Sequence, residues 1–579
     1  MKRYYKYIKP YLPYFIIGPL MMVVEVIGEV TMPYLMAQII NNGVAQRDVA
    51  YIVSTGLLMV LVALLMMGGG VGAAYFGAKA AVNFASDLRK DVFAKVQQFS
   101  FNNIDSFSTG SLVTRLTNDI TQMQNMVNMS LRMMLRAPGM MIGSIIMAFM
   151  MNAKLAVILL IAMPVLMIAI GTVTYFAFPK FEAMQKKLDR LNSKIQESLT
   201  NVRVIKSFVR EKHEEKNFKE ANGDLMDSSL RAFRIVILNM PIMALAMNIT
   251  TLVVVWFGGQ QIIAGDMLVG DLSSFISYIT QVLMSLMMLG MIILQSSRAM
   301  ASSKRICEVL DTEVDLTDDH ASQPEKKVES GKIEFKNVSF RYYKENHEKV
   351  LNNISLSIES GQTVGIIGST GCGKTTLVSM IPRLYDVDEG QVLVDGLDVK
   401  EYGLTNLRDG VGMVLQKNIL FSGTILENLQ WGDSEASMEE IRSVADASQA
   451  DGFVTSFPEG YETMLGQGGV NVSGGQKQRL CIARALLRKP KILILDDSTS
   501  AVDTATETKI RETFSTSLKD TTKIIIAQRI SSVMDADQIV VMDEGEIVGL
   551  GTHDQLLDAC EAYQEIYASQ MENKKEVGA

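Results

Sequence analysis

The sequence has few cysteines, and their spacing does not match that of a metal site. Only four of its 579 residues are cysteine, and all lie in the second half of the chain, at Cys307, Cys372, Cys481 and Cys560. We therefore expect a reduced, cytosolic environment for this half. Cys372 could sense oxidants, but we favour a role as a small filler residue.

A surplus of basic residues and a cleavable signal peptide are also missing. The net charge of −8 gives no reason to expect nucleic acid as a partner. Residues 1–9 are basic, but the apolar stretch that follows continues without a small-residue cleavage site.

Long apolar segments dominate the chain before residue 305, where 31 of the 38 methionines also lie. A helix needs about 20 largely apolar residues to cross a bilayer. Six segments meet this requirement, at 13–40, 51–79, 126–152, 155–179, 234–264 and 269–297. Several are longer than a bilayer is thick, so we expect their helices to continue beyond it. Residues 1–310 are predicted to form an all-α membrane domain.

The distribution of lysine and arginine predicts the orientation of these helices. The connections at 41–50, 152–154 and 264–271 carry only Arg47 and Lys154, whereas 80–125 and 180–233 are rich in both residue types. Basic loops stay in the cytosol. The amino terminus, both long loops and the second half are therefore expected there, with the membrane domain in the cytoplasmic membrane.

Two pairs of charged residues lie within the apolar segments, where charge is costly. Glu25 and Glu29 share one helix face, and they could line a cavity for cationic cargo or bond to neighbouring helices or a partner chain. Arg132 and Arg136 are expected to snorkel to the inner interface.

Both long loops contain segments suited to docking. Residues 107–119 break one helix and start another, and residues 201–208 carry apolar side chains inside a charged helical stretch. We expect both loops to contact another domain. The acidic, polar segment 311–331 is predicted to be an exposed linker before a second domain at 332–579.

A phosphate-binding loop is indicated at residues 368–376. It follows the apolar run 364–367 and precedes a helix-like segment from Leu377, the context that such a loop requires. Glycines let successive N–H groups point at one anion. Lys374 is expected to reach the outer phosphates and Thr375 to hold Mg²⁺. The predicted nucleotide-binding residues of the loop are Ser369, Thr370, Gly371, Cys372, Gly373, Lys374, Thr375 and Thr376.

Further motifs follow in the second domain. The segment 472–476 opens a helix over 477–487, which gives a second anion-binding helix start. The apolar run 492–495 is typical of a buried parallel strand, and it ends in Asp496 and Asp497. Asp496 is expected to act on Mg²⁺ through its water shell. Residues 500–503 come next, and another buried strand over 523–527 ends at Gln528.

With these motifs in this order and spacing, the chain resembles an ATP-binding cassette (ABC) exporter half-transporter over nearly its whole length. The resemblance implies six membrane helices fused to a soluble α/β phosphate-loop domain, with ATP and Mg²⁺ as cofactors. Tyr342 would stack on adenine, and Gln416 would sense Mg²⁺ and the attacking water. Two halves would pair head to tail, so that the signature run of one chain completes the ATP site of the other. The signature and following residues implied to contact nucleotide are Ser473, Gly474, Gly475, Gln476 and Asp503.

The chain departs from the family pattern where hydrolysis is catalysed. Asp497 stands in place of the catalytic glutamate and Gln528 in place of the switch histidine. Gln467 replaces a glutamate common before the signature, and Val472 a leucine. We therefore predict a degenerate site in this chain, which binds ATP but hydrolyses it slowly. The partner would be a second half-transporter that carries the competent glutamate and histidine.

The predicted function is ATP-driven export of amphipathic or peptide-like compounds by alternating access, which makes the chain an ABC-type transport ATPase. No peptidase-like region precedes the first helix, so cleavage of the cargo is not expected. One alternative is a lipid flippase or self-paired exporter of the same fold. Another, of a different class, is an ATP-gated channel or regulatory membrane subunit.

Overall fold

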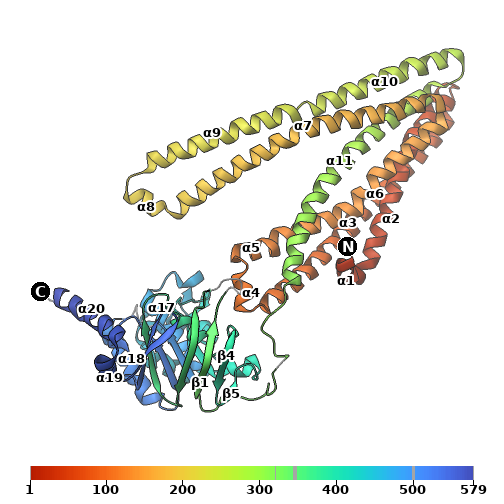
Figure 1. Cartoon of the computed structure of the whole chain (residues 1–579). Helices are drawn as coiled ribbons and strands as arrows, with labels where there is room; N and C mark the ends of the chain where they lie inside the picture. Colours follow the sequence, from red (N-terminus) through yellow and green to blue (C-terminus); the bar gives the residue numbers. More distant parts are fainter. Residues whose placement is uncertain (1, 320, 343–347, 498–502, 578–579) are drawn as a thin grey trace. The chain divides into compact units, whose positions relative to one another are not determined.

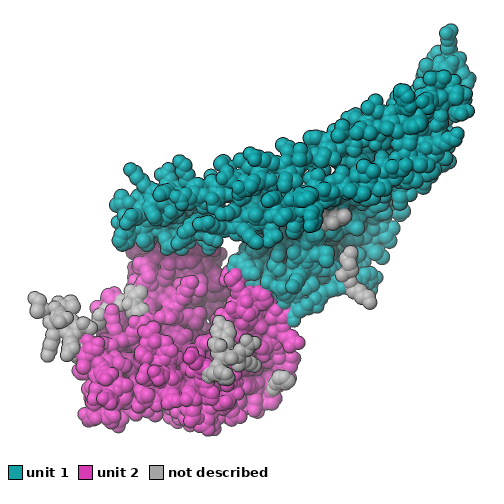
Figure 2. All heavy atoms as spheres, turned by 45° about the horizontal axis from the view of Figure 1, so that its top comes forward, with its two compact units in different colours: residues 1–96, 110–311 teal, residues 97–109, 312–579 magenta. Residues whose placement is uncertain are grey.

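The protein consists of an all-α unit and an α/β unit, which confirms the predicted fold class. The computed structural model describes residues 2–319, 321–342, 348–497 and 503–577. Unit 1 comprises residues 1–96 and 110–311, and unit 2 comprises residues 97–109 and 312–579 (Figure 2). The predicted linker boundaries, 311 and 331, stay a prediction.

Unit 1 is built from long helices. Among the described residues, six helical stretches are long and apolar enough to cross a membrane: Tyr5–Val44, Val49–Gln97, Thr109–Met151, Ala153–Thr200, Glu211–Ala264 and Val269–Asp311. Five of them contain one predicted segment in full, and Thr109–Met151 ends one residue before the end of 126–152. The helices are α1 (Tyr5–Ile8), α2 (Leu12–Gln38), α3 (Val49–Gln97), α5 (Thr109–Thr114), α6 (Ile120–Met151), α7 (Ala153–Thr200), α8 (Val202–Ser207), α9 (Glu211–Val236), α10 (Asn239–Ala264) and α11 (Val269–Asp311), with π-helical turns η3 (Ile39–Val44) and η4 (Arg115–Asp119).

These helices form a bundle and a long hairpin. Helix α11 packs along α6 and α2, and its Phe275 and Tyr278 are fully buried. Helix α7 runs beside α9 and α10, and the short α8 lies at the tip of this hairpin (Figure 1). Helices α2 and α3 approach closely at Gly69, which lacks a side chain. A Cβ atom at this position would lie only 2.8 Å from the carbonyl oxygen of Met21.

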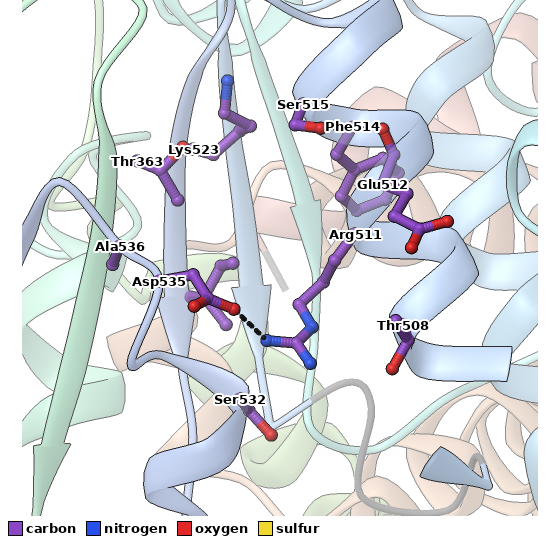
Figure 3. Close-up of a pocket in the computed structure, with 11 residues that line it drawn as sticks. Thr363, Thr508, Arg511, Glu512, Phe514, Ser515, Lys523, Ser532, Asp535 and Ala536 are labelled. Atoms are coloured by element: carbon purple, nitrogen blue, oxygen red, sulfur yellow. Dashed lines mark hydrogen bonds and ion pairs between the residues drawn. The ribbon is translucent and has the colours of Figure 1, made fainter. Parts of the chain in front are cut away.

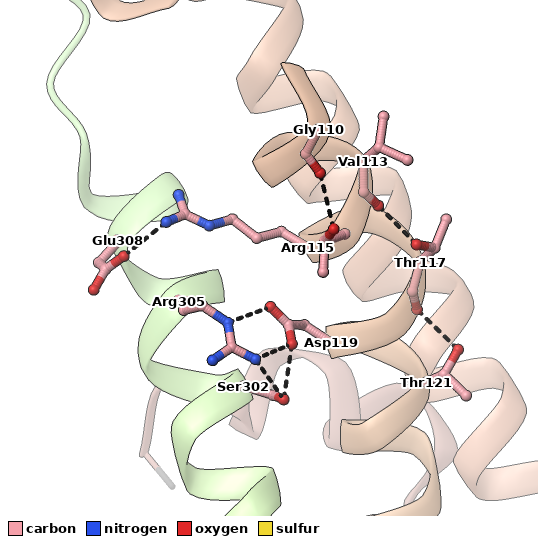
Figure 4. A network of polar contacts seen from close by, with 10 residues as sticks. Gly110, Val113, Arg115, Thr117, Asp119, Thr121, Ser302, Arg305 and Glu308 are labelled. Carbon is pink, nitrogen blue, oxygen red and sulfur yellow. Dashed lines mark hydrogen bonds and ion pairs between the residues drawn. The ribbon is translucent and has the colours of Figure 1, made fainter. Parts of the chain in front are cut away.

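A polar network ties η4, directly before α6, to the end of α11 (Figure 4). The carboxylate of Asp119 is buried and accepts hydrogen bonds from Arg305 Nε at 2.8 Å and Ser302 Oγ at 2.9 Å. One turn away, Arg115 pairs with Glu308 at 2.9 Å. Because both ion pairs join η4 to α11, they fix the register of these two elements.

Unit 2 is organised around a six-stranded sheet with the order β12-β11-β3-β10-β9-β6, in which only β12 is antiparallel to its neighbour. A four-stranded antiparallel sheet has the order β2-β1-β4-β5, and β7 pairs with β8. The strands are β1 (Ile333–Phe340), β2 (Leu351–Ile358), β3 (Thr363–Gly368), β4 (Glu389–Val394), β5 (Leu397–Asp398), β6 (Val411–Val414), β7 (Gly423–Thr424), β8 (Met464–Leu465), β9 (Ile492–Asp496), β10 (Thr522–Ile526), β11 (Gln538–Asp543) and β12 (Glu546–Gly551).

Alternate residues of the central strands face two different cores. In β9, Ile492 and Ile494 pack toward the antiparallel sheet, whereas Leu493 and Leu495 pack toward the helices. A strand covered on both faces is apolar throughout, which is why the run 492–495 was predictable. The helices of unit 2 are α4 (Phe101–Asp105), α12 (Lys374–Ser379), α13 (Leu404–Asp409), α14 (Ile425–Leu429), α15 (Met438–Ala447), α16 (Asp451–Ser456), α17 (Gly474–Leu487), α18 (Thr504–Ser517), α19 (His553–Ala559) and α20 (Glu561–Val577).

Helix α4 lies in the first long loop, just before the motif at 107–119, and it is part of unit 2, so docking of the motif itself stays a prediction. The Tyr385 hydroxyl donates to Asp105 Oδ2 at 2.9 Å, and the Tyr385 ring packs on Phe101 with centroids 6.0 Å apart. The second docking segment forms α8, a separate short helix rather than part of a longer one. Val204 of α8 is 54% exposed and Phe208, directly after this helix, is 73% exposed, whereas Ile205 is only partly exposed.

The segment before β1 is less exposed than its composition suggests. Leu316 and Val328 are buried, and Val328 belongs to the core shared by the two larger sheets. The Asp395 carboxylate accepts hydrogen bonds from the backbone N–H groups of residues 329–332. These bonds fix the end of the segment to the turn between β4 and β5.

Candidate nucleotide site

The loop at 368–376 connects β3 to α12, which confirms its predicted strand–loop–helix context. Gly373 has a φ of 95°, and a Cβ atom there would lie 2.8 Å from the carbonyl oxygen of Val350. A side chain is therefore excluded for two reasons at this position. Lys374 Nζ donates to the carbonyl oxygens of Gly368 at 2.9 Å and Ser369 at 2.7 Å, so its ammonium lies over the loop.

Two of the three predicted Mg²⁺ residues, Thr375 and Asp496, lie together. Thr375 Oγ1 donates to the Asp496 carboxylate, with oxygen–oxygen distances of 3.1 and 2.9 Å. Asp496 is 1% exposed, and this burial raises its pKa, although the Thr375 hydroxyl acts in the opposite direction. Hydroxyl and carboxylate oxygens are the hard ligands that Mg²⁺ prefers, and its charge would offset the burial of the carboxylate. These residues therefore fit the cation.

The predicted hydrolytic residues also converge. Asp497 follows β9 with a φ of 48°, and Gln528 Nε2 donates to its Oδ2 at 2.7 Å. Gln416 hydrogen-bonds to the same carboxylate. Burial raises the pKa of Asp497, and the bonds from both amides only partly oppose this shift. Gln416 and Gln528, two predicted site residues from separate segments, thus both contact the carboxylate of a third, Asp497.

Tyr342 lies beside the loop, within an aromatic cluster. Its hydroxyl lies 2.9 Å from Thr376 Oγ1, and its ring packs edge-on against Phe340 and Tyr385, with centroids 5.0 and 5.2 Å away. Its stacking on adenine stays a prediction.

The signature residues form the start of α17. Ser473 caps this helix: its Oγ accepts from the Gln476 N–H at 3.3 Å, and the Gln476 side chain accepts from the Ser473 N–H at 2.9 Å. Ser473 and Gly474 are exposed, whereas Val472 is buried, so the departure at 472 lies in the core. Asp503 caps α18 by accepting from the Thr506 N–H at 3.0 Å, and this backbone bond lowers the Asp503 pKa. Residues 500–502 lie outside the described residues.

Three residues of the two charged pairs in the apolar segments, Glu25, Glu29 and Arg136, pair with each other. Arg136 contacts Glu25 Oε1 at 2.8 Å and Glu29 Oε2 at 3.0 Å. Snorkelling of Arg136 to the interface was therefore a wrong prediction, because packing of α6 on α2 brings both carboxylates within its reach. Bonding to a neighbouring helix, one of the two roles considered for the glutamates, is therefore present, and lining a cavity for cationic cargo stays a prediction. Glu29 and Arg136 also border a pocket of about 400 Å³ with Met140, Met284 and Met288.

Sequence reasoning missed two residues that support the site. Asp543, at the end of β11, accepts from Ser369 Oγ at 3.1 Å. Gln570, in α20, bonds to the backbone of the segment that begins at Gln528. Only the spacing of Gln570 from Tyr563, two helical turns along an apolar stripe, could have pointed to it.

A separate pocket of about 270 Å³ lies between α18, β10 and the segment after Gln528 (Figure 3). Arg511 reaches across it, pairs with Asp535 at 3.5 Å and donates to the carbonyl oxygen of Ser531 at 2.9 Å. This arginine connects the helix that Asp503 caps with the segment that follows Gln528.

Comparison with known proteins agrees with this geometry. Residues 15–286 match the family described as the ABC transporter transmembrane region, and residues 351–500 match the family described as ABC transporter. An uncharacterised ABC transporter ATP-binding protein of Bacillus subtilis is 41% identical, with 98% of each chain covered. An ATP-dependent lipid A-core flippase of Syntrophus aciditrophicus is 31% identical, with 99% of this chain and 95% of the flippase covered.

The same architecture occurs in a solved structure. A bacterial Atm1-family ABC exporter with ATP bound superposes with a TM-score of 0.78 at 26% identity, with 96% of this chain and 98% of that exporter covered. The exporter fold, the phosphate loop and the convergence of Asp496, Asp497 and Gln528 are all accounted for by one conclusion. This chain is a multi-pass membrane protein of the ABC transporter family, an ABC exporter half-transporter with a transport ATPase domain.

Proposed function

We propose that this chain is the degenerate-site subunit of a heterodimeric exporter. One observation carries the proposal: the residue at the hydrolytic position is an aspartate, Asp497, and Gln528 Nε2 donates a hydrogen bond to its Oδ2 at 2.7 Å. Asp497 is one methylene shorter than the family's glutamate, and a misplacement of about 1 Å can slow a reaction roughly a hundredfold. Gln528 cannot become cationic, so it stabilises developing phosphate charge less than a histidine would.

The binding half of the site supports ATP retention. Lys374 lies over the phosphate loop, and Thr375 and Asp496 lie together. Mg²⁺ bound at Thr375 and Asp496 would neutralise phosphate charge. A site with these groups and a weakened hydrolytic position would hold ATP longer than it cleaves it.

The exposed signature supports the other role of this chain. Ser473 and Gly474, at the start of α17, would complete the competent site of the partner. The exposed apolar surface of α8 would dock on the partner's nucleotide domain and transmit its movement to the membrane helices. Two ATP molecules would then hold the nucleotide domains together and favour an outward-open transporter.

The proposed cargo is amphipathic, and export proceeds from the cytosol across the cytoplasmic membrane. One relative, 33% identical and from Bacillus subtilis, is described as a putative multidrug export ATP-binding/permease protein. The flippase relative favours lipid transport as the second candidate. Hydrophobic small molecules, peptides and lipids all share the amphipathic chemistry that methionine-lined membrane pockets accept.

The test is purification of the tagged chain from its native membrane, followed by ATPase measurement with and without its partner. We expect a second, different half-transporter to co-purify, and substrate-stimulated hydrolysis to require it. Robust cooperative hydrolysis by this chain alone would contradict the proposal. ATP-dependent ion conductance in place of transport would favour the channel alternative.

A further inference from the structure

The C-terminal helix α20 reaches back to the nucleotide site. We propose that Gln570 is a positioning residue, through which α20 fixes Gln528 against Asp497 and so determines how long this chain's own site retains ATP. This inference rests on the proposed function, because it concerns retention at the slowly hydrolysing site.

Gln570 uses both ends of its amide on one backbone segment. Its Nε2 donates to the carbonyl oxygen of Gln528 at 2.8 Å, and its Oε1 accepts from the N–H of Ile530 at 2.9 Å. The two bonds lie on either side of Arg529, so they define both the position and the orientation of the backbone that carries Gln528. A single bond would leave the segment free to rotate about it.

The position of Gln570 is itself fixed by the core. Tyr563 is fully buried, and its hydroxyl lies 2.7 Å from His553 Nδ1. Ile566 and Tyr567 pack on the same core. Residues 563, 566, 567 and 570 follow the i, i+3, i+4, i+7 spacing of one helix face. Gln570 therefore lies half-buried on the core-facing side of α20, where the segment after β10 supplies partners for both ends of its amide.

The backbone segment that Gln570 positions carries Gln528, whose side chain contacts the carboxylate of Asp497. The Gln528 side chain donates to Asp497, and a second helix holds the residues that follow, because Arg511 of α18 donates to the carbonyl oxygen of Ser531. The segment 528–531 is thus held by two helices. Of these two contacts, the one from α20 is made to Gln528 itself. Loss of the Gln570 bonds would release Gln528 from Asp497 without removing either residue.

The experiment uses the full chain co-purified with its partner in lipid nanodiscs. A photo-crosslinkable, radiolabelled ATP analogue is bound with Mg²⁺, and its dissociation from this chain's band is followed after a chase with unlabelled ATP. Gln570→Glu places a carboxylate against the carbonyl oxygen of Gln528, and Gln570→Ala removes both bonds. Both variants should release the analogue about tenfold faster at pH 7.5, as expected for the loss of roughly 1.4 kcal/mol.

A matched control lies on the same helix. Gln564 donates to the carbonyl oxygen of Leu557 at 2.6 Å, so Gln564→Glu makes the same chemical change away from Gln528. Each release rate is divided by that of the unsubstituted complex at the same pH. Toward acidic pH a protonated glutamate regains an O–H donor. The Gln570→Glu ratio should therefore return toward one, whereas the Gln570→Ala ratio stays high and the Gln564→Glu ratio stays near one.

Equal release from Gln570→Glu and the unsubstituted complex at pH 7.5 would overturn the inference. So would an equal acceleration in Gln564→Glu, because the effect would then belong to the helix as a whole. The proposed function fails separately: if the complex proves to be two identical chains with fast hydrolysis, the heterodimer is wrong. In that case the ratio of the ATP-analogue release rate of Gln570→Glu to that of the unsubstituted protein still tests the positioning role.

Discussion

Two pairs of carboxylates, one in each unit, receive different partners. In the membrane unit, Glu25 and Glu29 share a single arginine, Arg136, at 2.8 and 3.0 Å. In the nucleotide unit, Asp496 accepts from the Thr375 hydroxyl, and Asp497 accepts from the amide of Gln528. The first pair has its cation within the chain, whereas the donors named for the second pair are neutral.

This difference separates a structural cluster from a binding site. A cation fixed between two glutamates neutralises part of their charge permanently, which suits the interior of a membrane unit. Neutral donors only partly offset the burial of Asp496 and Asp497, whose pKa values stay raised. A group left in this condition gains most from an external cation, and Mg²⁺ with ATP brings one.

Removing the internal cation should have the largest effect. Replacing Arg136 with Gln leaves two glutamates facing each other, and breaking a buried pair costs about 3–5 kcal/mol. We expect the lower end here, because the Arg136 side chain keeps 30% of its surface exposed. The free energy of unfolding in detergent is measured by denaturant titration of the variant and the unsubstituted protein.

The control for this change neutralises all three residues. The variant Glu25→Gln/Glu29→Gln/Arg136→Gln should recover most of the lost stability, because no unpaired charge is left. If Arg136→Gln alone is as stable as the unsubstituted protein, the cluster is not structural, and the comparison between the two pairs breaks.

Removing a carboxylate from the second pair should weaken binding rather than folding. Asp496→Asn takes away the charge that faces Mg²⁺, and hydrogen bonds to charged groups contribute about 1.5–3 kcal/mol. We expect Mg²⁺-dependent ATP affinity to fall about 10–100-fold, with thermal stability unchanged or raised. The measurement is equilibrium binding of a fluorescent ATP analogue with and without Mg²⁺. Asp543→Asn, which alters only the carboxylate that accepts from Ser369, is the control and should keep the Mg²⁺ dependence.

The contrast also explains what the sequence could predict. The six apolar segments and the buried strand before Asp496 follow from local composition, since burial on all sides demands apolar residues throughout. The meeting of Asp496, Asp497 and Gln528 was predictable because parallel strands β9 and β10 are neighbours and end at one edge of the sheet.

Contacts between distant elements were not predictable in this way. Arg136 lies 107 residues from Glu29, and Gln570 lies 42 residues from Gln528. Each contact depends on how one helix packs against another element. The local sequence of α6 does not indicate which of its faces packs against α2. Val204 and Phe208 were singled out for docking because a charged stretch does not otherwise need apolar residues; both are exposed, and their docking stays a prediction.

Restoring the family residues should sharpen the asymmetry within the nucleotide site. The double variant Asp497→Glu/Gln528→His lengthens the carboxylate and introduces a titratable donor. We expect hydrolysis at this chain's own site to rise about tenfold, part of the hundredfold that a 1 Å misplacement can remove. Single-turnover hydrolysis in the complex, with the partner's catalytic glutamate replaced by Gln, isolates this site. No gain over the unsubstituted chain in that background would mean that geometry outside these two residues limits the rate.

The smallest expected effect is a dependence of nucleotide affinity on pH. Burial raises the pKa of Asp496 and Asp497 above the ordinary value near 3.9. A proton on either carboxylate competes with Mg²⁺, so Mg²⁺-ATP affinity should fall severalfold as the pH drops toward these raised values. The ligand-free fold behaves oppositely, because it binds these protons more tightly than the unfolded chain does. The contribution of the two groups to stability therefore grows as the pH falls through the folded pKa and is lost as the pH rises through it.

Isothermal titration calorimetry between pH 8 and pH 5 should detect proton release when Mg²⁺-ATP binds, and this release should be smaller in Asp496→Asn. Equal release in both proteins would assign the titration to other groups.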